Sequence, residues 1–120
     1  MLFTHEVKSM AYLRKEKETV ETDFPLEKIW TAILKVLTSL EWNIEQIDEE
    51  AHHIEAKTKK SFMSWGSTLL IDAVPVDEKT TRVSIAAETP TTTITSIVDF
   101  GQTRRRISLF FAELAKQLAK

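Results

Sequence analysis

Histidines and adjacent acids are the side chains of this sequence that could bind a metal ion or transfer a proton. His52 and His53 are neighbours, so on a strand their rings point to opposite faces and cannot chelate one ion together. His5 lies far from both along the chain. Glu49 and Glu50 fall in a predicted turn, where solvated carboxylates are expected rather than a tuned acid–base pair. We therefore predict no metal site.

The motifs of covalent catalysis and of phosphate binding are absent from the sequence. It contains no cysteine, which excludes thiolate nucleophiles, disulfides and cysteine-based metal sites. Its two glycines, Gly66 and Gly101, cannot build a glycine-rich phosphate loop or a Gly-x-Ser-x-Gly elbow. We predict no cofactor and favour a non-enzymatic protein, an expectation that a cluster of perturbed acids in a cleft would reverse.

A basic and aromatic stretch over residues 57–65 is the most suggestive candidate for binding a partner. Three lysines are followed at once by three large apolar residues: Lys57, Lys59, Lys60, Phe62, Met63 and Trp65. Such a segment between strands can hold anionic lipid, nucleic acid or a protein. In the alternative, the aromatic side chains cap one end of the core and the lysines only solubilise the chain. We favour this alternative, because buried aromatics are the rule in so small a core.

Three consecutive arginines, Arg104, Arg105 and Arg106, are a second candidate partner site. At the beginning of a helix each would oppose the helix dipole at about 0.3–1 kcal/mol, and a bound anion or acidic partner would offset that cost. Salt bridges to acids on neighbouring strands are the explanation that we favour, since exposed arginines are well screened. A helix that begins earlier, near residues 95–99, removes the penalty altogether.

Hydrophobic periodicity predicts the elements that position these residues. Near the C-terminus, apolar residues follow the i, i+3, i+4, i+7, i+11 spacing of one helix side: Ile107, Phe110, Phe111, Leu114 and Leu118. Several short β-branched segments precede them and are typical of a sheet with one apolar face. We predict a long C-terminal helix laid across an antiparallel sheet.

Earlier in the chain, residues 1–16 fit a short helix or an irregular arm equally well, and a strand with alternating polarity begins at Thr19. Pro25 suits the first turn of a helix that runs to about Leu40. Its apolar stripe is predicted to face the core: Leu26, Ile29, Trp30, Ile33, Leu37 and Leu40.

Two hairpins are predicted between the helices, one from strands 42–47 and 53–58 and one from strands 67–76 and 81–88. Pro75 cannot donate a ladder hydrogen bond, so it indicates an edge or a fraying strand end. Residues 89–96 fit a further strand or a connecting loop. The predicted fold is α+β, an antiparallel sheet of four to six strands with two helices packed on one face, in the order β-α-β-β-β-β-α.

Composition is typical of one folded domain over residues 1–120 with its core in 19–118, since 42% of the residues are hydrophobic and 28% are charged. A net charge of −2 provides no general attraction to nucleic acid, which we do not expect as a partner. No stretch approaches 18 apolar residues, so no transmembrane segment is predicted. Residues 1–14 lack the apolar run of a signal peptide. We expect a cytoplasmic protein, with removal of a leader left open.

The order of elements resembles the helix-grip arrangement of START-like (SRPBCC) domains and of BamC-like outer-membrane lipoprotein domains. Two stretches carry the resemblance: Phe24, Pro25, Leu26, Glu27, Lys28, Ile29 and Trp30, and Ile107, Ser108, Leu109, Phe110, Phe111, Ala112, Glu113 and Leu114. A second resemblance is to small uncharacterised bacterial domains with an Asp-x-Gly-x-Asn-x-x-x-Ile-like lead into their last helix, here Asp99, Gly101, Thr103 and Ile107. The resemblance carries over no catalytic residue.

Two functional hypotheses follow. The START-like resemblance implies a small apolar or amphipathic ligand between the last helix and the sheet, in contact with Trp30, Ile107, Phe110, Phe111 and Leu114. It predicts a cavity of at least about 300 Å³ under that helix, and a solidly packed interface would contradict it. The second hypothesis is a protein-interaction or regulatory module that uses residues 57–65, together with Arg104 and Arg105. Oligomeric state is not predicted.

Overall fold

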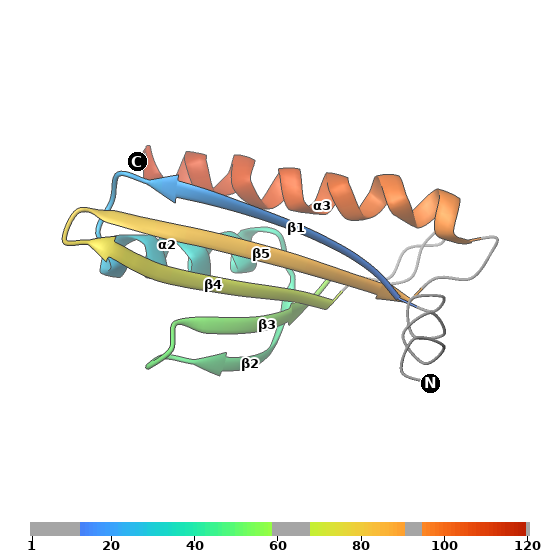
Figure 1. Cartoon of the computed structure of the whole chain (residues 1–120), viewed down its shortest axis with the longest axis horizontal. Coiled ribbons are helices and arrows are strands. Elements are labelled where there is room, and N and C mark those ends of the chain that lie inside the picture. Colours follow the sequence, from blue (N-terminus) through green and yellow to red (C-terminus); the bar gives the residue numbers. More distant parts are fainter. Residues whose placement is uncertain (1–12, 59–67, 91–94, 120) are drawn as a thin grey trace, which may run out of the picture.

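The computed structural model of the chain describes residues 13–58, 68–90 and 95–119, and within them the side chains of residues 17–58, 68–88 and 104–119. The elements follow one another as β1 (Leu13–Thr22), α2 (Leu26–Ser39), β2 (Asn43–Asp48), β3 (His53–Lys57), β4 (Thr68–Asp77), β5 (Thr80–Pro90) and α3 (Thr95–Leu118) (Figure 1). This order confirms the predicted α+β fold. Among the described residues, neither helix is both long enough and apolar enough to span a membrane.

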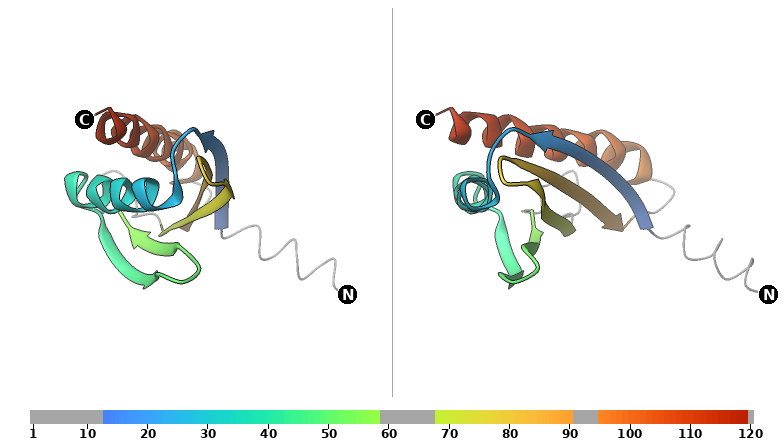
Figure 2. Two further views of the ribbon diagram at one scale, coloured as in Figure 1. Left: turned by 90° about the vertical axis from the view of Figure 1, so that its left-hand side faces the viewer. Right: turned by 60° about the vertical axis from the view of Figure 1, so that its left-hand side comes forward.

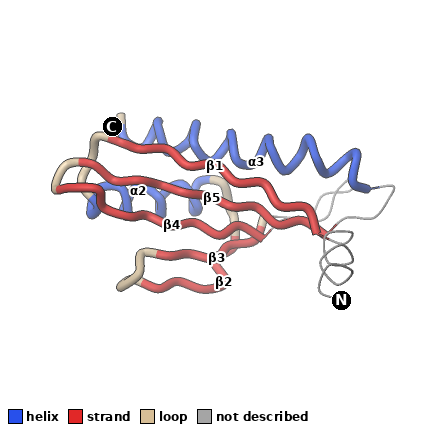
Figure 3. Tube along the Cα trace, in the orientation of Figure 1, coloured by secondary structure: helices blue, strands red, loops and turns tan. Residues whose placement is uncertain are grey.

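All neighbouring strands are antiparallel, in the spatial order β1-β5-β4-β3-β2 (Figure 3). The first strand therefore pairs with the last, from Leu13 opposite Pro90 to Thr22 opposite Thr81. β1 and β2 form the two edges of the described sheet. Because β1 and β5 are far apart in sequence, this pairing closes the largest loop of the fold.

The first strand is longer than predicted. We expected a helix or an arm up to residue 16 and a strand from Thr19, whereas β1 begins at Leu13. Its early residues show no alternation of polarity, but their backbone pairs with β5 along the full length of the strand. Pairing with a distant partner thus overrides local pattern, as is common for strands. Residues 1–12 lie outside the described residues.

α2 confirms the predicted amphipathic stripe. Pro25 precedes the first helical residue with an extended backbone, and Glu27 places an acid in the first turn, where the helix dipole favours it. The buried face also includes two residues that the predicted stripe omitted, Ala32 and Val36. The backbone of Glu41 adopts a positive φ of 59°, which lets the chain leave the helix directly into β2.

Both helices cover one face of a curved sheet (Figure 2). Alternate strand residues point to that concave face and form one hydrophobic core with the helices: Ile54, Ala56, Leu69, Ile71, Ala73, Val83, Ile85 and Ala87. On β3 and just after it, Ile54, Ala56 and Thr58 face inward while Lys57 is exposed. The period of two along each strand therefore separates a dry face from an open one.

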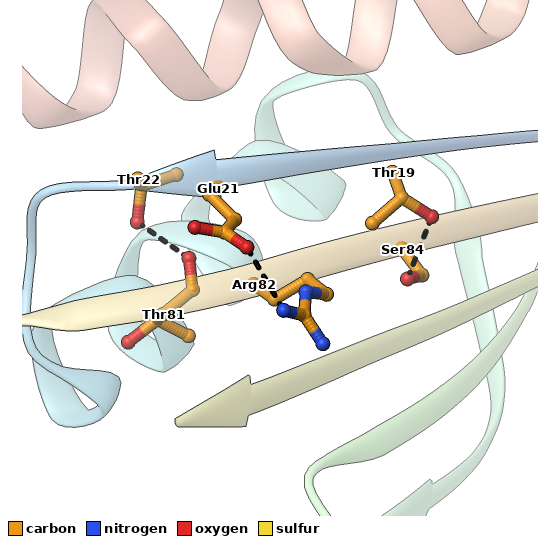
Figure 4. A network of polar contacts seen from close by, with 6 residues as sticks. All are labelled: Thr19, Glu21, Thr22, Thr81, Arg82 and Ser84. Atoms are coloured by element: carbon orange, nitrogen blue, oxygen red, sulfur yellow. Dashed lines mark hydrogen bonds and ion pairs between the residues drawn. The ribbon is translucent and has the colours of Figure 1, made fainter. Parts of the chain in front are cut away.

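The opposite, convex face carries polar pairs across neighbouring strands. Figure 4 shows the hydroxyls of Thr19 and Ser84 3.1 Å apart, and the guanidinium of Arg82 donating to Glu21 over 2.8 Å. Further across the sheet, His53 Nδ1 lies 2.7 Å from Asp72 Oδ1. These are exposed or half-exposed side chains on a face that neither helix covers.

The long final helix begins at Thr95, so the alternative with an early start is confirmed. Arg104, Arg105 and Arg106 lie in its middle and do not oppose the dipole of its first turn. β5 extends to Pro90, and residues 91–94 lie outside the described residues. Pro75 pairs with Thr81 of β5 beside a register irregularity, and it lies beyond the five residues of β4 that pair with β3. It therefore occupies a local edge of the described sheet, which is one of the two predicted positions.

Candidate ligand-binding site

The core-facing side of α3 is made of three of the predicted ligand residues. Ile107, Phe110 and Leu114 are buried in the same cluster as α2 and the sheet, and Phe110 is fully buried. Phe111 packs against this cluster, with its ring edge-to-face on that of Phe110 at 5.2 Å. The structure therefore brings these four residues together under α3, where most of their surface is taken up by packing.

A cavity opens beside them, between α3 and the edge strand β1. Lys17 and Glu18 line it from the strand, and Arg104, Ile107 and Ser108 line it from the helix. Ile107 is the one apolar residue among these five, and it also belongs to the buried core. The opening therefore connects solvent to the apolar underside of α3.

The volume of this cavity is about 130 Å³. The prediction of a cavity of at least about 300 Å³ under the helix is therefore wrong for the described residues, because the inner side of α3 is packed against the core. The volume is also below the usual range of pockets for drug-sized molecules. It fits a small molecule or one end of a longer one. The larger hollows among the described residues lie elsewhere, between α2 and the end of α3 and at the turn between β4 and β5.

Trp30, the fifth predicted ligand residue, has a different position. Its indole Nε1–H donates to Glu49 Oε1 at 3.4 Å, and the ring of His52 meets its ring edge-on at 5.0 Å. Trp30 thus anchors the turn between β2 and β3 on α2. It does not line the opening beside α3.

The three arginines point in three directions, because consecutive helical residues are about 100° apart. Arg104 lines the opening, Arg105 is exposed, and Arg106 is only 9% exposed. They therefore do not form one continuous anion site. Of the other predicted partner residues, Lys57 is exposed at the end of β3, whereas Lys59, Lys60, Phe62 and Trp65 lie outside the described residues. The partner site stays a prediction.

Sequence reasoning missed three residues of the opening, Lys17, Glu18 and Ser108. The first two belong to a charge run without apolar periodicity, and Ser108 sits between apolar positions of the final helix. Their shared location depends on β1 lying beside α3, which no local pattern encodes. The one signal that pointed here was the apolar stripe through Ile107.

His52, His53 and the turn acids Glu49 and Glu50 are engaged in local structure, whereas His5 lies outside the described residues. His53 faces Asp72, and Asp48 Oδ1 accepts the backbone N–H groups of Glu50 and Ala51 in the turn. Within residues 13–58, 68–90 and 95–119, no three metal-binding side chains gather at one place.

Comparisons with known proteins place this architecture among solved structures. No family model and no curated protein sequence match the chain. The Zhui aromatase/cyclase from Streptomyces sp. R1128 aligns over 88% of this chain and 94% of its own, with a TM-score of 0.66 and 12% identity. Norcoclaurine synthase from Thalictrum flavum, in complex with dopamine and hydroxybenzaldehyde, aligns over 94% and 91%, with a TM-score of 0.67 and 11% identity.

A conserved protein from Geobacillus kaustophilus aligns over 88% of this chain and 95% of its own, with a TM-score of 0.56 and 14% identity. The chain has a helix-grip fold. The START-like resemblance read from residues 24–30 and 107–114 is thereby confirmed at the level of fold. Because these solved structures share only 11–14% sequence identity with the chain, they show its fold and not its function.

Proposed function

We propose that this helix-grip domain binds a small apolar or amphipathic molecule at the opening between β1 and α3. The observation that carries the proposal is the double position of Ile107, which lines the opening and also belongs to the buried core. A ligand that reaches Ile107 leaves water for an apolar surface, and each Å² of apolar surface buried contributes roughly 25 cal/mol.

The rim of the opening favours a ligand with a polar end. Lys17, Glu18, Arg104 and Ser108 provide cationic, anionic and hydroxyl groups at the mouth. Phe110 and Phe111 follow Ile107 in the sequence of α3 and belong to or pack against the same core cluster, but they do not line the opening. In small-molecule sites a few polar groups fix the orientation of the ligand, and here four polar residues surround the one apolar contact, Ile107.

The residues of the opening support ligand binding rather than catalysis. In the described part of the chain, Ser108 has no hydrogen-bonded base beside it, so it lacks the activation that a serine nucleophile requires. The structure of norcoclaurine synthase with dopamine and hydroxybenzaldehyde offers an example of small molecules held by this fold. Because one fold hosts many functions, that example supports the site class and no particular ligand.

Blocking the opening tests the proposal. Ser108→Trp adds a large side chain at an exposed position of the rim, and Leu109→Trp adds the same group to an exposed neighbour that does not line the opening. With the amphipathic dye ANS as probe, we expect Ser108→Trp to weaken binding at least about tenfold, equivalent to about 1.4 kcal/mol. Leu109→Trp should bind like the wild type.

Thermal unfolding of both variants is the control, and their melting temperatures should stay close to that of the wild type because both positions are exposed. Equal dye binding by both variants would contradict the proposal. If Ser108→Trp does weaken dye binding, native mass spectrometry of wild-type protein purified from its own host should identify a retained molecule. The Ser108→Trp variant should lack that molecule.

A further inference from the structure

The small net charge of the chain conceals a strong segregation of charge. Residues 41–57 contain six of the eighteen acids and only one of the sixteen lysines and arginines. The remainder has twelve acids and fifteen basic residues. Five of these six acids lie in the hairpin of β2 and β3, which is therefore acidic, while the remainder of the chain carries an excess of cations.

The same hairpin exposes an apolar strip. A register shift between Ile44 and Gln46 places Ile44 opposite Ala56 and Ile47 opposite Ile54. Both partners on β3 face the core, so the shift puts both isoleucines on one face of the hairpin. Ile44 is nevertheless 39% exposed and Ile47 45% exposed, because all six residues of β2 reach beyond the cover of α2. The result is an exposed apolar strip on the inner face of an acidic hairpin.

This hairpin is held in one conformation before any partner arrives. Asp48 Oδ1 accepts two backbone N–H groups of the turn at 3.0 Å each. Glu49 accepts the indole N–H of Trp30, whose ring also contacts His52. A preordered surface loses little conformational entropy on binding, which favours association.

A hollow of opposite character lies between α2 and the end of α3. Two adjoining depressions of about 420 and 450 Å³ share Thr31, Lys35 and Gln117 as lining residues. Apolar side chains contribute to their lining: Ala32, Leu34 and Leu118. Lys28 and Lys35 provide cations from α2, and the exposed Lys116 lies in the last turn of α3. We call this the interhelical groove.

Two acids lie near the interhelical groove. Glu113 accepts a hydrogen bond from Ser39 at one end, and Glu27 is exposed in the first turn of α2. They leave the lysines in excess. Lys28 also lies over the ring of Phe24, 4.8 Å from its centroid, so this cation is held close to the surface of α2.

We infer that the acidic hairpin of one copy docks into the interhelical groove of a second copy. Charge and polarity match, because an acidic hairpin that exposes Ile44 and Ile47 meets a groove in which lysines accompany Leu34 and Leu118. The lengths also match, since six strand residues span about 20 Å and the fourteen residues of α2 span about 21 Å.

The two surfaces lie on opposite flanks of α2, with α3 on one side and β2 on the other (Figure 2). One molecule can therefore use both surfaces at once. Such a head-to-tail contact produces an open chain, or a ring if the rotation closes. The kind of partner that fits this surface is thus a further copy of the same domain.

Sedimentation velocity over a range of concentrations at low salt tests the inference. We expect the average mass of the wild type to rise with concentration past the dimer and to fall in about 1 M salt, where the Debye length is about 3 Å. Lys28→Glu with Lys35→Glu should reduce the association constant at least tenfold. Lys79→Glu, at the exposed turn between β4 and β5, is the matched control and should associate like the wild type.

A complementary pair of variants makes the test specific. Glu45→Lys with Glu50→Lys and Glu55→Lys reverses the net charge of residues 43–57 from −4 to +2 and should also prevent self-association. A mixture of the groove variant and the hairpin variant should associate again, because each reversed surface then meets its complement on the other chain. Circular dichroism confirms that both variants are folded. A wild type that stays monomeric, or a mixture that fails to associate, overturns the inference.

Discussion

The two faces of the sheet use the same five strands in opposite ways. On the concave face, alternate residues such as Ile54, Ile71 and Ile85 are fully buried beneath α2 and α3. On the convex face, the intervening residues form exposed polar pairs such as Glu21 with Arg82. This difference indicates that the buried concave face provides most of the stability of the domain.

On the concave side, the cavity of the proposed ligand site lies at the margin of the sheet. The centre is closed by side chains from both helices and the sheet, whereas the flank of α3 beside β1 opens into a cavity that Ile107 shares with the core. We conclude that the concave face both stabilises the domain and contains the proposed ligand site. The convex face contributes little to either.

Phe110→Ala should give the largest loss of stability, because it removes a fully buried ring from the centre of the concave side. Large-to-small replacements of buried phenylalanine cost about 3–5 kcal/mol of unfolding free energy. Leu109→Ala, on the exposed side of the same helix, should change stability by less than about 0.5 kcal/mol. Chemical denaturation measures both, and similar losses for the two variants would contradict the comparison.

Thr81→Val tests a polar group on the buried side. The Thr81 hydroxyl is fully buried and donates to the carbonyl oxygen of Phe24 at 2.8 Å, while the Thr81 carbonyl accepts from Thr22 (Figure 4). Losing the hydroxyl donor leaves the partly buried carbonyl of Phe24 short of a partner, so we expect a loss of about 1–2 kcal/mol.

Thr19→Val is the matched control, since it makes the same replacement on the convex face and removes only an exposed contact with Ser84. Its expected effect is within about 0.5 kcal/mol. If Thr19→Val destabilises as much as Thr81→Val, the two faces are less different than we describe.

The ion pair of Glu21 and Arg82 should give the smallest effect. Both side chains are about half exposed, and exposed pairs contribute between about 0.2 and 1 kcal/mol. A double-mutant cycle with Glu21→Gln and Arg82→Gln should yield a coupling free energy at the low end of this range. The coupling should weaken further in high salt, because the pair is screened. A coupling free energy well above 1 kcal/mol would contradict the comparison, because the convex face would then contribute substantially to stability.

The sequence predicted most of the fold because its helices and inner strands carry clear periods. The stripes through Ile33 and Ile107 marked the helices, and the alternation through Ile54 and Val83 marked the strands. The start of β1 could not be predicted, since its charged residues show no period and its partner β5 lies more than sixty residues away. Long-range pairing, rather than local preference, defines that element.

The candidate site was predictable only in part, for the same reason. Ile107, Phe110, Phe111 and Leu114 were predicted from helical spacing, and they do lie together under α3. Lys17 and Glu18 join them only because β1 ends up beside that helix. Trp30 shows the converse case: its apolar character predicted burial correctly, but its indole N–H is directed to Glu49 in a turn that spacing does not place.

Methyl NMR of isoleucine-labelled protein during titration with ANS tests the central claim most directly. The account predicts a saturable shift of the Ile107 methyl signals, with Ile44 on the exposed hairpin unchanged. Shifts confined to Ile44, or a titration that leaves Ile107 unaffected while the dye binds, would contradict a ligand site between β1 and α3.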